Sequence, residues 1–440
     1  MTGTLNLGNI STRQKRIAQL AREDRDRCFH SLAHSIDEFW LQEAFYRTRR
    51  DGAPGVDGQT WEAYEKDLGN NVRDLQDRFK SGRYRAPPVR RTYIPKGDGT
   101  QVRPIGIPTL EDKVLQRAVT MLLEPVYEET FLECSYGYRP GRSAHDAVEA
   151  LWQGTMGMGG GWVQEVDIRS FFEELDPRHL RSFLDRRVRD GVIRRTIDKW
   201  LKAGVFEEGR VHQRTLGTPQ GGVISPLLAN LYLHEVVDRW FAETVQSRLE
   251  GRAVLIRYAD DMVFVFELEH DARRFSKVLP KRLARFGLRL HPEKTRLLDF
   301  RRPRTGGPRG KGPRSFDFLG FTHHWGRSRH GRWVVKRTTA KGRLSRALRR
   351  IREWCRRHLH QPVWWQRQML SQKLKGHYGY FGITGNRRAL ESFYWHVERI
   401  WRTWLNRRSQ KARMIWSRFT RLLRRYPLPK PRIVHSYVKT

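Results

Sequence analysis

The feature that most constrains the fold is a short stretch, residues 253–266, in which two apolar runs flank the sequence Arg-Tyr-Ala-Asp-Asp. Short β-branched and aromatic runs that are broken by a tight polar step predict a buried β-hairpin. The turn would carry two adjacent carboxylates, Asp260 and Asp261. Adjacent carboxylates repel each other and need a counter-charge, most simply a divalent cation. An acidic turn without a function is the other interpretation, because Asp favours turns.

The positive charge of the chain is concentrated in its last third. The 440 residues carry a net charge of +38, and residues 301–440 hold 37 Lys and Arg against 4 Asp and Glu. Tryptophan and tyrosine are interleaved with these basic residues, as phosphate contacts and base stacking require. The sequence shows neither a long apolar span nor a signal peptide. It therefore indicates a nucleic-acid partner, no membrane and a cytoplasmic location.

The three cysteines predict no structural cross-link. Cys28, Cys134 and Cys355 lie far apart and form no Cys-x-x-Cys pair. A disulfide framework, a zinc ribbon and a cysteine-rich nuclease finger are therefore not expected.

Hydrophobic periodicity predicts a mixed fold with helices and strands. Helices are expected at 13–50 and, after a glycine-rich break at 51–58, in a second stretch that ends at about 79. Further helices are expected at 110–131, 146–152, 180–201, 226–241, 271–286 and through most of 341–423. Strands are expected at 91–96, 102–108, 162–172, 253–266 and 316–321. The fold class is therefore α+β.

Three carboxylates stand at the ends of predicted strands. Asp167 follows one strand, and Asp260 and Asp261 occupy the hairpin turn. If these side chains met at one end of a sheet, they could hold two Mg²⁺ ions about 4 Å apart. One ion would activate a primer 3′-hydroxyl and the other would carry a triphosphate, so that catalysis would rest on positioning and charge neutralisation.

A second predicted hairpin, residues 91–108, carries Lys96 and Arg103. Two cations close together are able to hold a triphosphate. Two exposed charges beside a turn are an equally good interpretation of this stretch alone.

Several long blocks of the sequence resemble reverse transcriptases. These are YADD at 258–261, GTPQGGVISPLLANLYL at 217–233 and VDIRSFF at 166–172. Further blocks resemble group II intron-encoded reverse transcriptases in particular: RPIGIP at 103–108, SYGYRPGRSAHDA at 135–147 and GAPGVDG at 52–58. The resemblance runs from about residue 25 to 435, and two C-terminal blocks are similar to the thumb and maturase domain of that family: LKGHYGYFGITGN at 374–386 and YPLPKPRIVH at 426–435.

The resemblance implies a right-hand polymerase fold in three domains. Residues 1–160 would form an N-terminal extension and the fingers, and residues 161–328 a palm with an antiparallel sheet that carries the catalytic carboxylates. Residues 329–440 would form a basic helical thumb and maturase domain. A Cys/His endonuclease extension, which many members carry, is not expected.

The resemblance also implies a role for single residues. Asp167, Asp260 and Asp261 would be catalytic metal ligands, and Ile168 would add its backbone carbonyl to one of two Mg²⁺ ions. The incoming dNTP would contact a further set: Lys96 and Arg103 at the triphosphate, Phe171 or its competitor Phe172 at the sugar, and Gln220 and Ala259 near the nascent base pair. Lys294 would lie near the primer end.

The expected function is that of an RNA-directed DNA polymerase of a group II intron, which also acts as a maturase for splicing. Its partners would be the intron RNA, an RNA template with a DNA primer, dNTPs and target DNA. Two alternatives are a splicing cofactor that needs no polymerase activity and a domesticated host reverse transcriptase in repair or phage defence.

Overall fold

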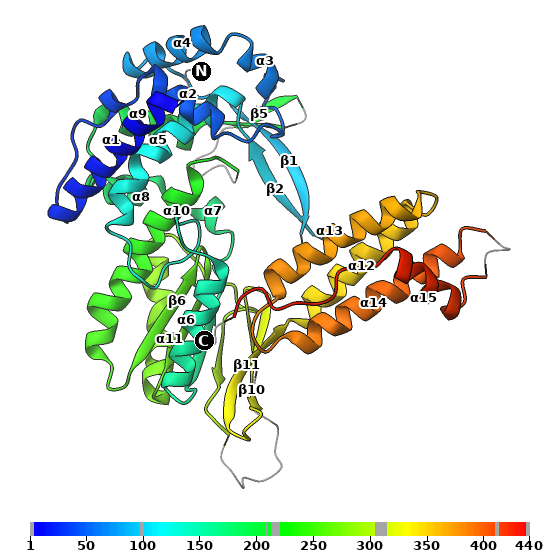
Figure 1. The fold of residues 1–440 in the computed structure, drawn as a ribbon. Coiled ribbons are helices and arrows are strands. Elements are labelled where there is room, and N and C mark those ends of the chain that lie inside the picture. The colour runs from blue at the N-terminus through cyan, green and yellow to red at the C-terminus, as the bar shows by residue number, and fades with distance from the viewer. Residues whose placement is uncertain are drawn as a thin grey trace. The chain divides into compact units, whose positions relative to one another are not determined.

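A computed structural model describes residues 4–96, 101–207, 209–212, 221–303, 315–409 and 413–436 of the chain. Helices and strands are mixed, so the fold is α+β, as predicted (Figure 1). The chain divides into two compact units. Unit 1 comprises Met1–Ala147 and Gln164–Leu297, and unit 2 comprises Val148–Val163 and Leu298–Thr440.

The first part of unit 1 is helical. It contains α1 (Thr4–Glu23), η1 (Ala33–Ser35), α2 (Glu38–Tyr46), α3 (Trp61–Glu65), α4 (Leu68–Lys80) and α5 (Leu110–Glu128). The continuous helix predicted over 13–50 is wrong, because the chain leaves the helix after Glu23. The Leu32 and Ala33 amides donate to Asp190 (2.6 and 2.8 Å), and the Asp37 side chain caps α2. Local polar contacts therefore outweigh the helical periodicity here.

The predicted hairpin at 91–108 is confirmed. Strands β1 (Val89–Lys96) and β2 (Gln101–Ile107) pair antiparallel, with Lys96 opposite Gln101 and Arg103 opposite Ile94. Two short strands, β4 (Val205–Glu207) and β5 (Arg210–His212), extend this sheet in the order β2-β1-β4-β5.

A second sheet has the order β6-β7-β3-β8. Its strands are β3 (Trp162–Val166), β6 (Ala253–Tyr258), β7 (Asp261–Phe266) and β8 (Arg296–Asp299). The predicted strand at 162–172 ends early, because Ser170 adopts a left-handed conformation (φ 43°) and α7 (Phe171–Glu174) follows. The hairpin predicted over 253–266 is confirmed.

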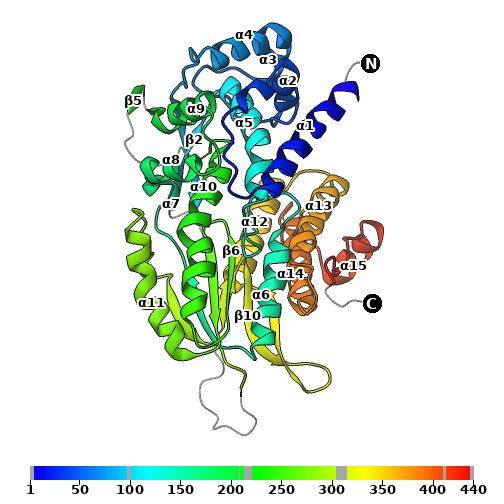
Figure 2. The ribbon, with the colours of Figure 1, turned by 90° about the vertical axis from the view of Figure 1, so that its left-hand side faces the viewer.

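Further helical elements of unit 1 lie between β3 and β8 in the chain. They are α8 (Pro177–Asp185), α9 (Gly191–Lys202), α10 (Ser225–Leu233), two π-helical segments (His234–Asp238 and Phe241–Val245), η4 (Gln246–Arg248) and α11 (Glu269–Ala284). Asp190 caps α9 and so divides the helix that was predicted over 180–201. In Figure 2, α11 lies along the sheet; its Phe275 contacts Phe264 and Phe266 of β7 with ring centroids 4.6 and 5.1 Å apart.

Unit 2 joins a small sheet to a group of helices. The sheet has the order β11-β10-β9, with β9 (Phe316–Phe318), β10 (Phe321–Arg327) and β11 (Trp333–Thr339). The helices are α12 (Lys341–Arg357), α13 (Val363–Phe381), α14 (Arg387–Asn406) and α15 (Trp416–Arg425); helix α6 (Ala144–Gly157) crosses from unit 1 into unit 2. The strand β11 was not predicted: no helix or strand was expected between 321 and 341, although the side chains of β11 alternate in burial from Val334 onward.

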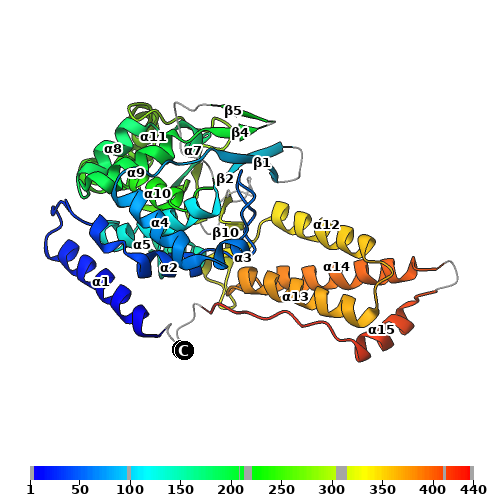
Figure 3. The same ribbon diagram turned by 90° about the horizontal axis from the view of Figure 1, so that it is seen from above.

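Helices α12, α13 and α14 lie side by side (Figure 3). Their apolar faces form one core, which includes Ile351 and Cys355 of α12, Leu374 of α13 and Trp401 of α14. The buried Trp401 indole N–H donates to the Gln366 side chain (2.8 Å) and so has its hydrogen-bond partner within this core.

Candidate active site

The two carboxylates of the hairpin stand at a strained two-residue turn. Tyr258 of β6 pairs with Asp261 of β7, so that Ala259 and Asp260 form the turn itself. Ala259 is buried and has φ 56°. A left-handed conformation costs a residue with a Cβ about 1–2 kcal/mol. The surrounding protein must therefore hold Ala259 in place.

Asp167 follows β3 and is tied to a distant part of the chain. The His291 amide donates to the Asp167 carbonyl (2.8 Å), and the Arg169 amide donates to the Arg289 carbonyl (2.8 Å). This pairing brings Lys294 to the Asp167 side chain, where Nζ lies 2.9 Å from Oδ2. Lys294 therefore contacts one of the proposed metal ligands directly.

Ile168 lies between these two hydrogen bonds, in an isolated antiparallel bridge with Leu290. In such a pair the flanking residues make the ladder hydrogen bonds, and the central N–H and C=O point to the other side of the strand. The Ile168 carbonyl therefore faces away from Leu290, toward the edge on which β7 pairs with β3.

Electrostatic coupling links the turn to Asp167. Burial raises the pKa of Asp260, the negative charge of Asp167 raises it further, and the positive charges of Arg103 and Lys294 act against this rise. Two carboxylates and two cations from four separate segments are thus close enough to influence one another. The predicted grouping of Asp167, Asp260, Arg103 and Lys294 is consistent with this coupling.

The carboxylates do not form a closed metal cage. Within the described ranges, no three His, Cys, Asp or Glu side chains are grouped closely enough to hold a metal ion. The oxygen donors nevertheless fit a hard divalent cation, and the raised pKa of Asp260 shows an unfavourable negative charge that a cation would relieve. At Asp167, Lys294 supplies that positive charge.

The two phenylalanines after Asp167 differ in exposure. Phe171 is 3% exposed and packs against Tyr232 (6.3 Å between ring centroids), whereas Phe172 is partly exposed. Phe171 is therefore a core residue. Phe172 presents more of its ring to solvent.

Gln220 and the side chain of Lys96 lie outside the described residues. Arg103 is exposed on β2.

Tyr138 borders the turn, although no role was predicted for it from the sequence. Its ring is 57% exposed, and the pKa of its hydroxyl is raised by partial burial and by the charge of Asp260. The preceding Gly137 lies so close to the turn that a Cβ there would be 2.4 Å from the Ala259 nitrogen. Gly137, inside the block Ser-Tyr-Gly-Tyr, was the signal in the sequence that could have placed this segment beside the turn, because a glycine permits close approach of another backbone.

In the part of the chain that is described, no helix combines the length and the apolar character that crossing a bilayer requires.

The chain matches a protein family and several known proteins. The family described as "Reverse transcriptase (RNA-dependent DNA polymerase)" matches residues 94–323. Protein YkfC of Escherichia coli (strain K12) is 36% identical over 288 residues, and the match covers 58% of this chain and 75% of that protein. Group II intron-encoded protein LtrA of Lactococcus lactis subsp. cremoris is 34% identical over 226 residues, 50% of this chain and 37% of LtrA.

A plant protein also matches part of this chain. Nuclear intron maturase 2, mitochondrial, of Arabidopsis thaliana is 27% identical over 226 residues, 41% of this chain and 30% of that protein. The aligned segment thus spans well under half of LtrA and of the maturase. The family match covers the hairpin, Asp167 and Arg103 alike, and the chain therefore belongs to the reverse transcriptases, which are RNA-dependent DNA polymerases.

Proposed function

We propose that this reverse transcriptase extends a DNA primer on an RNA template with Asp167, Asp260 and Asp261 as its catalytic carboxylates. The observation that carries this assignment is the two-residue turn that presents Asp260 and Asp261, in a segment that the reverse transcriptase family matches; the contact of Asp167 with Lys294 (2.9 Å) supports it. Carboxylates and cations together suit a reaction in which a triphosphate approaches a 3′-hydroxyl.

We propose that the carboxylates hold two Mg²⁺ ions, with the Ile168 carbonyl as a further ligand. When bound, such ions would lower the pKa of the primer hydroxyl and neutralise the leaving pyrophosphate. The chain itself contributes Arg103, and by sequence Lys96, as cations for the triphosphate. Lys294, which pairs with Asp167, would stand near the primer end.

The remaining assignments concern the sugar, the base pair and the domains. The exposure of Phe172 favours it over Phe171 as the ring against the sugar, and Ala259 and Gln220 would lie near the nascent base pair. Residues 1–160, 161–328 and 329–440 would act as fingers, palm, and thumb with maturase domain.

We also propose that the chain is a maturase that binds its own group II intron RNA and then target DNA in a bacterial cytoplasm. LtrA is named as group II intron-encoded and a plant relative as an intron maturase. The helices α12 to α15 of this chain supply a basic surface with exposed Trp364, Trp395 and Trp416, which suits RNA.

Primer extension tests the polymerase assignment. Wild type, Asp260→Ala and the control Asp74→Asn, which changes an exposed carboxylate on α4, would be compared on an RNA template with dNTPs and Mg²⁺. We expect extension by wild type and by the control, and none above background by Asp260→Ala, because the turn would lose a metal ligand. Affinity for intron RNA should stay within about threefold, since no phosphate contact is removed.

Each other outcome has a definite meaning. Loss of RNA binding together with extension in Asp260→Ala would assign Asp260 a structural role. Folded wild type that binds and splices intron RNA without extending a primer would be a splicing cofactor. Extension without any response to intron RNA would favour a domesticated host enzyme.

A further inference from the structure

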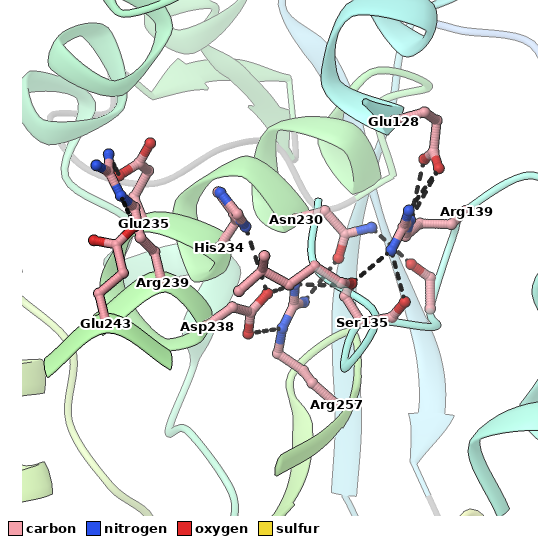
Figure 4. A network of polar contacts seen from close by, with 12 residues as sticks. Glu128, Ser135, Arg139, Asn230, His234, Glu235, Asp238, Arg239, Glu243 and Arg257 are labelled. Atoms are coloured by element: carbon pink, nitrogen blue, oxygen red, sulfur yellow. Dashed lines mark hydrogen bonds and ion pairs between the residues drawn. The ribbon is translucent and has the colours of Figure 1, made fainter. Parts of the chain in front are cut away.

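A buried arginine supports the turn that carries the carboxylates. Arg257 of β6 is 0% exposed, and so is the side chain of Asp238. The guanidinium donates twice to this carboxylate, from Nε to Oδ1 (2.7 Å) and from Nη2 to Oδ2 (2.5 Å), as Figure 4 shows. Burial by itself would lower the pKa of Arg257, but the charge and hydrogen bonds of Asp238 outweigh burial, and the pKa is raised. Arg257 is therefore a fixed, charged group.

The same guanidinium reaches three further acceptors. Nη1 donates to the Asn230 side chain (2.9 Å) and to the Ala259 carbonyl (3.2 Å), and Nη2 donates to the Ser135 hydroxyl (2.8 Å). The bond to Ala259 acts on the turn itself. The planar fork of an arginine can serve these directions at once, whereas a lysine ammonium is a point charge on a flexible stem.

The segment from Cys134 to Gly137 holds the turn from another side. The Arg257 amide donates to the Cys134 carbonyl, and the Tyr136 amide donates to the Arg257 carbonyl (both 2.8 Å). Asn230, which already contacts the guanidinium, donates to the Gly137 carbonyl (2.6 Å). Arg139 anchors this segment in turn, through Ser135 O (3.0 Å) and Glu128 (2.9 Å) (Figure 4).

Local helix geometry explains how Asp238 and Asn230 both face Arg257. Asp238 follows Asn230 by eight positions, which is more than two turns of an α-helix, since 3.6 residues make one turn. In a regular α-helix the two side chains would therefore point in different directions. The π-helical segment His234–Asp238 winds more residues into each turn and so brings Asp238 back toward the line of Asn230. π-Helical segments occur frequently at functional sites.

We propose that Arg257 is a positioning residue of the polymerase reaction. By holding the Ala259 carbonyl, it keeps Ala259 in its left-handed conformation and thereby fixes the points at which Asp260 and Asp261 leave the turn. Asp238, Asn230 and Ser135 hold the guanidinium in place. The inference rests on the proposed roles of Asp260 and Asp261, so its test needs a readout that does not depend on catalysis.

Arg257→Lys is the informative variant, because a lysine retains the charge pair with Asp238 but not the fork. Arg187→Lys is the matched control: Arg187 is also buried and donates to a carbonyl, that of Ala21 (3.1 Å), which is not part of the turn. For both variants, the melting temperature, single-nucleotide extension (kcat and KM for dTTP), the Kd for template-primer and the amide hydrogen exchange of residues 258–261 would be measured.

We expect Arg257→Lys to lower kcat by about 10²-fold, because a displaced turn misplaces both carboxylates. KM and the template-primer Kd should stay within about threefold, since a fully buried Arg257 side chain is out of reach of both ligands. Amide exchange at 258–261 should become faster. Arg187→Lys should keep the wild-type kcat and the wild-type exchange in the turn, whatever its melting temperature.

Wild-type kcat in folded Arg257→Lys, or a loss equal to its unfolded fraction, would overturn the inference. If wild type extends no primer, the proposed function fails, and amide exchange then tests only whether Arg257 holds the turn. Unchanged exchange in Arg257→Lys would overturn that hold, and faster exchange would support it. If Arg257→Lys does not fold, Arg257→Met/Asp238→Leu removes both buried charges together and takes its place in every measurement.

Discussion

Backbone strain in this protein is concentrated in single residues around the candidate site. Among the described residues, four without glycine's freedom have positive φ: Tyr138, Ser170, Ala259 and Leu319. Ala259 forms the carboxylate turn, Ser170 precedes the phenylalanine pair, and Tyr138 borders Ala259. Such strain persists only where surrounding contacts impose it, and it is frequent at functional sites. The contacts around Ala259 are those of Arg257 and Gly137.

The phenylalanine pair yields a prediction at the same scale. Phe172→Val should relax discrimination against ribonucleotides by about tenfold or more, because a smaller side chain admits a 2′-hydroxyl. Phe171→Val should leave discrimination unchanged and lower the free energy of unfolding by about 1–3 kcal/mol, because it opens a cavity beside Tyr232. The measurements are kcat/KM for dTTP and UTP, and urea unfolding. Relaxed discrimination in Phe171→Val alone would reverse the two roles.

At the level of elements, the sheet of unit 2 contains an uncompensated polar group. His323 of β10 is buried, stacks on Phe316 of β9 (4.9 Å between centroids, 7° between planes), and lies opposite Arg337 of β11. Neither ring nitrogen has a hydrogen-bond partner within the described part of the chain. Burial first, then the charges of Arg337 and His324, lower the pKa of His323 to about 3.

This lowered pKa makes the stability of unit 2 depend on pH. The unfolded chain takes up the proton near the ordinary histidine pKa of 6.5, whereas the folded chain does so only near 3. The contribution of neutral His323 is therefore complete above about pH 6.5 and is lost as the pH falls toward 3, by up to about 1.4 kcal/mol per pH unit. His323→Phe keeps the ring stack and should make the slope shallower by up to about 1.4 kcal/mol per pH unit. Part of the slope should remain, because burial also lowers the pKa values of His234 and His377 to about 4.

The measurement is the free energy of unfolding in urea of wild type and His323→Phe between pH 4.5 and 7.5. His330→Gln is the control, because His330 is exposed in the turn between β10 and β11 and is not among the groups that lower the pKa of His323. Equal slopes for wild type and His323→Phe would contradict the assignment.

At the scale of the whole molecule, charge and chemistry are separated along the chain. The first 300 residues hold 48 Lys and Arg against 43 Asp and Glu, and the last 140 hold 37 against 4. All three proposed catalytic carboxylates belong to unit 1, while the helices α12 to α15 belong to unit 2. Substitutions in the basic helices should therefore change RNA affinity without changing the catalytic carboxylates, and substitutions of the carboxylates should do the reverse.

RNA affinity should consequently decline steeply with salt, as bound counterions are released. Arg349→Gln/Arg350→Gln on α12 should weaken RNA binding and lower the magnitude of the log Kd–log [salt] slope by about 0.7 for each lost phosphate contact. The control Lys277→Gln/Lys281→Gln removes two exposed charges from α11 and should change the slope less. A flat salt response of the wild type would contradict the role of the basic helices.

The sequence by itself determined the parts that depend on neighbours along the chain. The β6–β7 hairpin follows from apolar runs on both sides of a polar step, and the β1–β2 hairpin from the turn between two short strands. The ends of these strands locate Asp260 and Asp261, and the order of the motifs identifies the family. Local patterns were insufficient where polar caps divide a helix, as Asp37 and Asp190 do.

Only the tertiary structure decided which distant groups meet. Lys294 contacts Asp167 from 127 positions away, and Arg257 joins Ser135, Asn230 and Asp238 around one turn. Burial likewise separates Phe171 from Phe172, which are indistinguishable as neighbours in sequence. The physical reason is that burial and long-range hydrogen bonds arise from the packing of whole elements, which no periodicity of a single segment encodes.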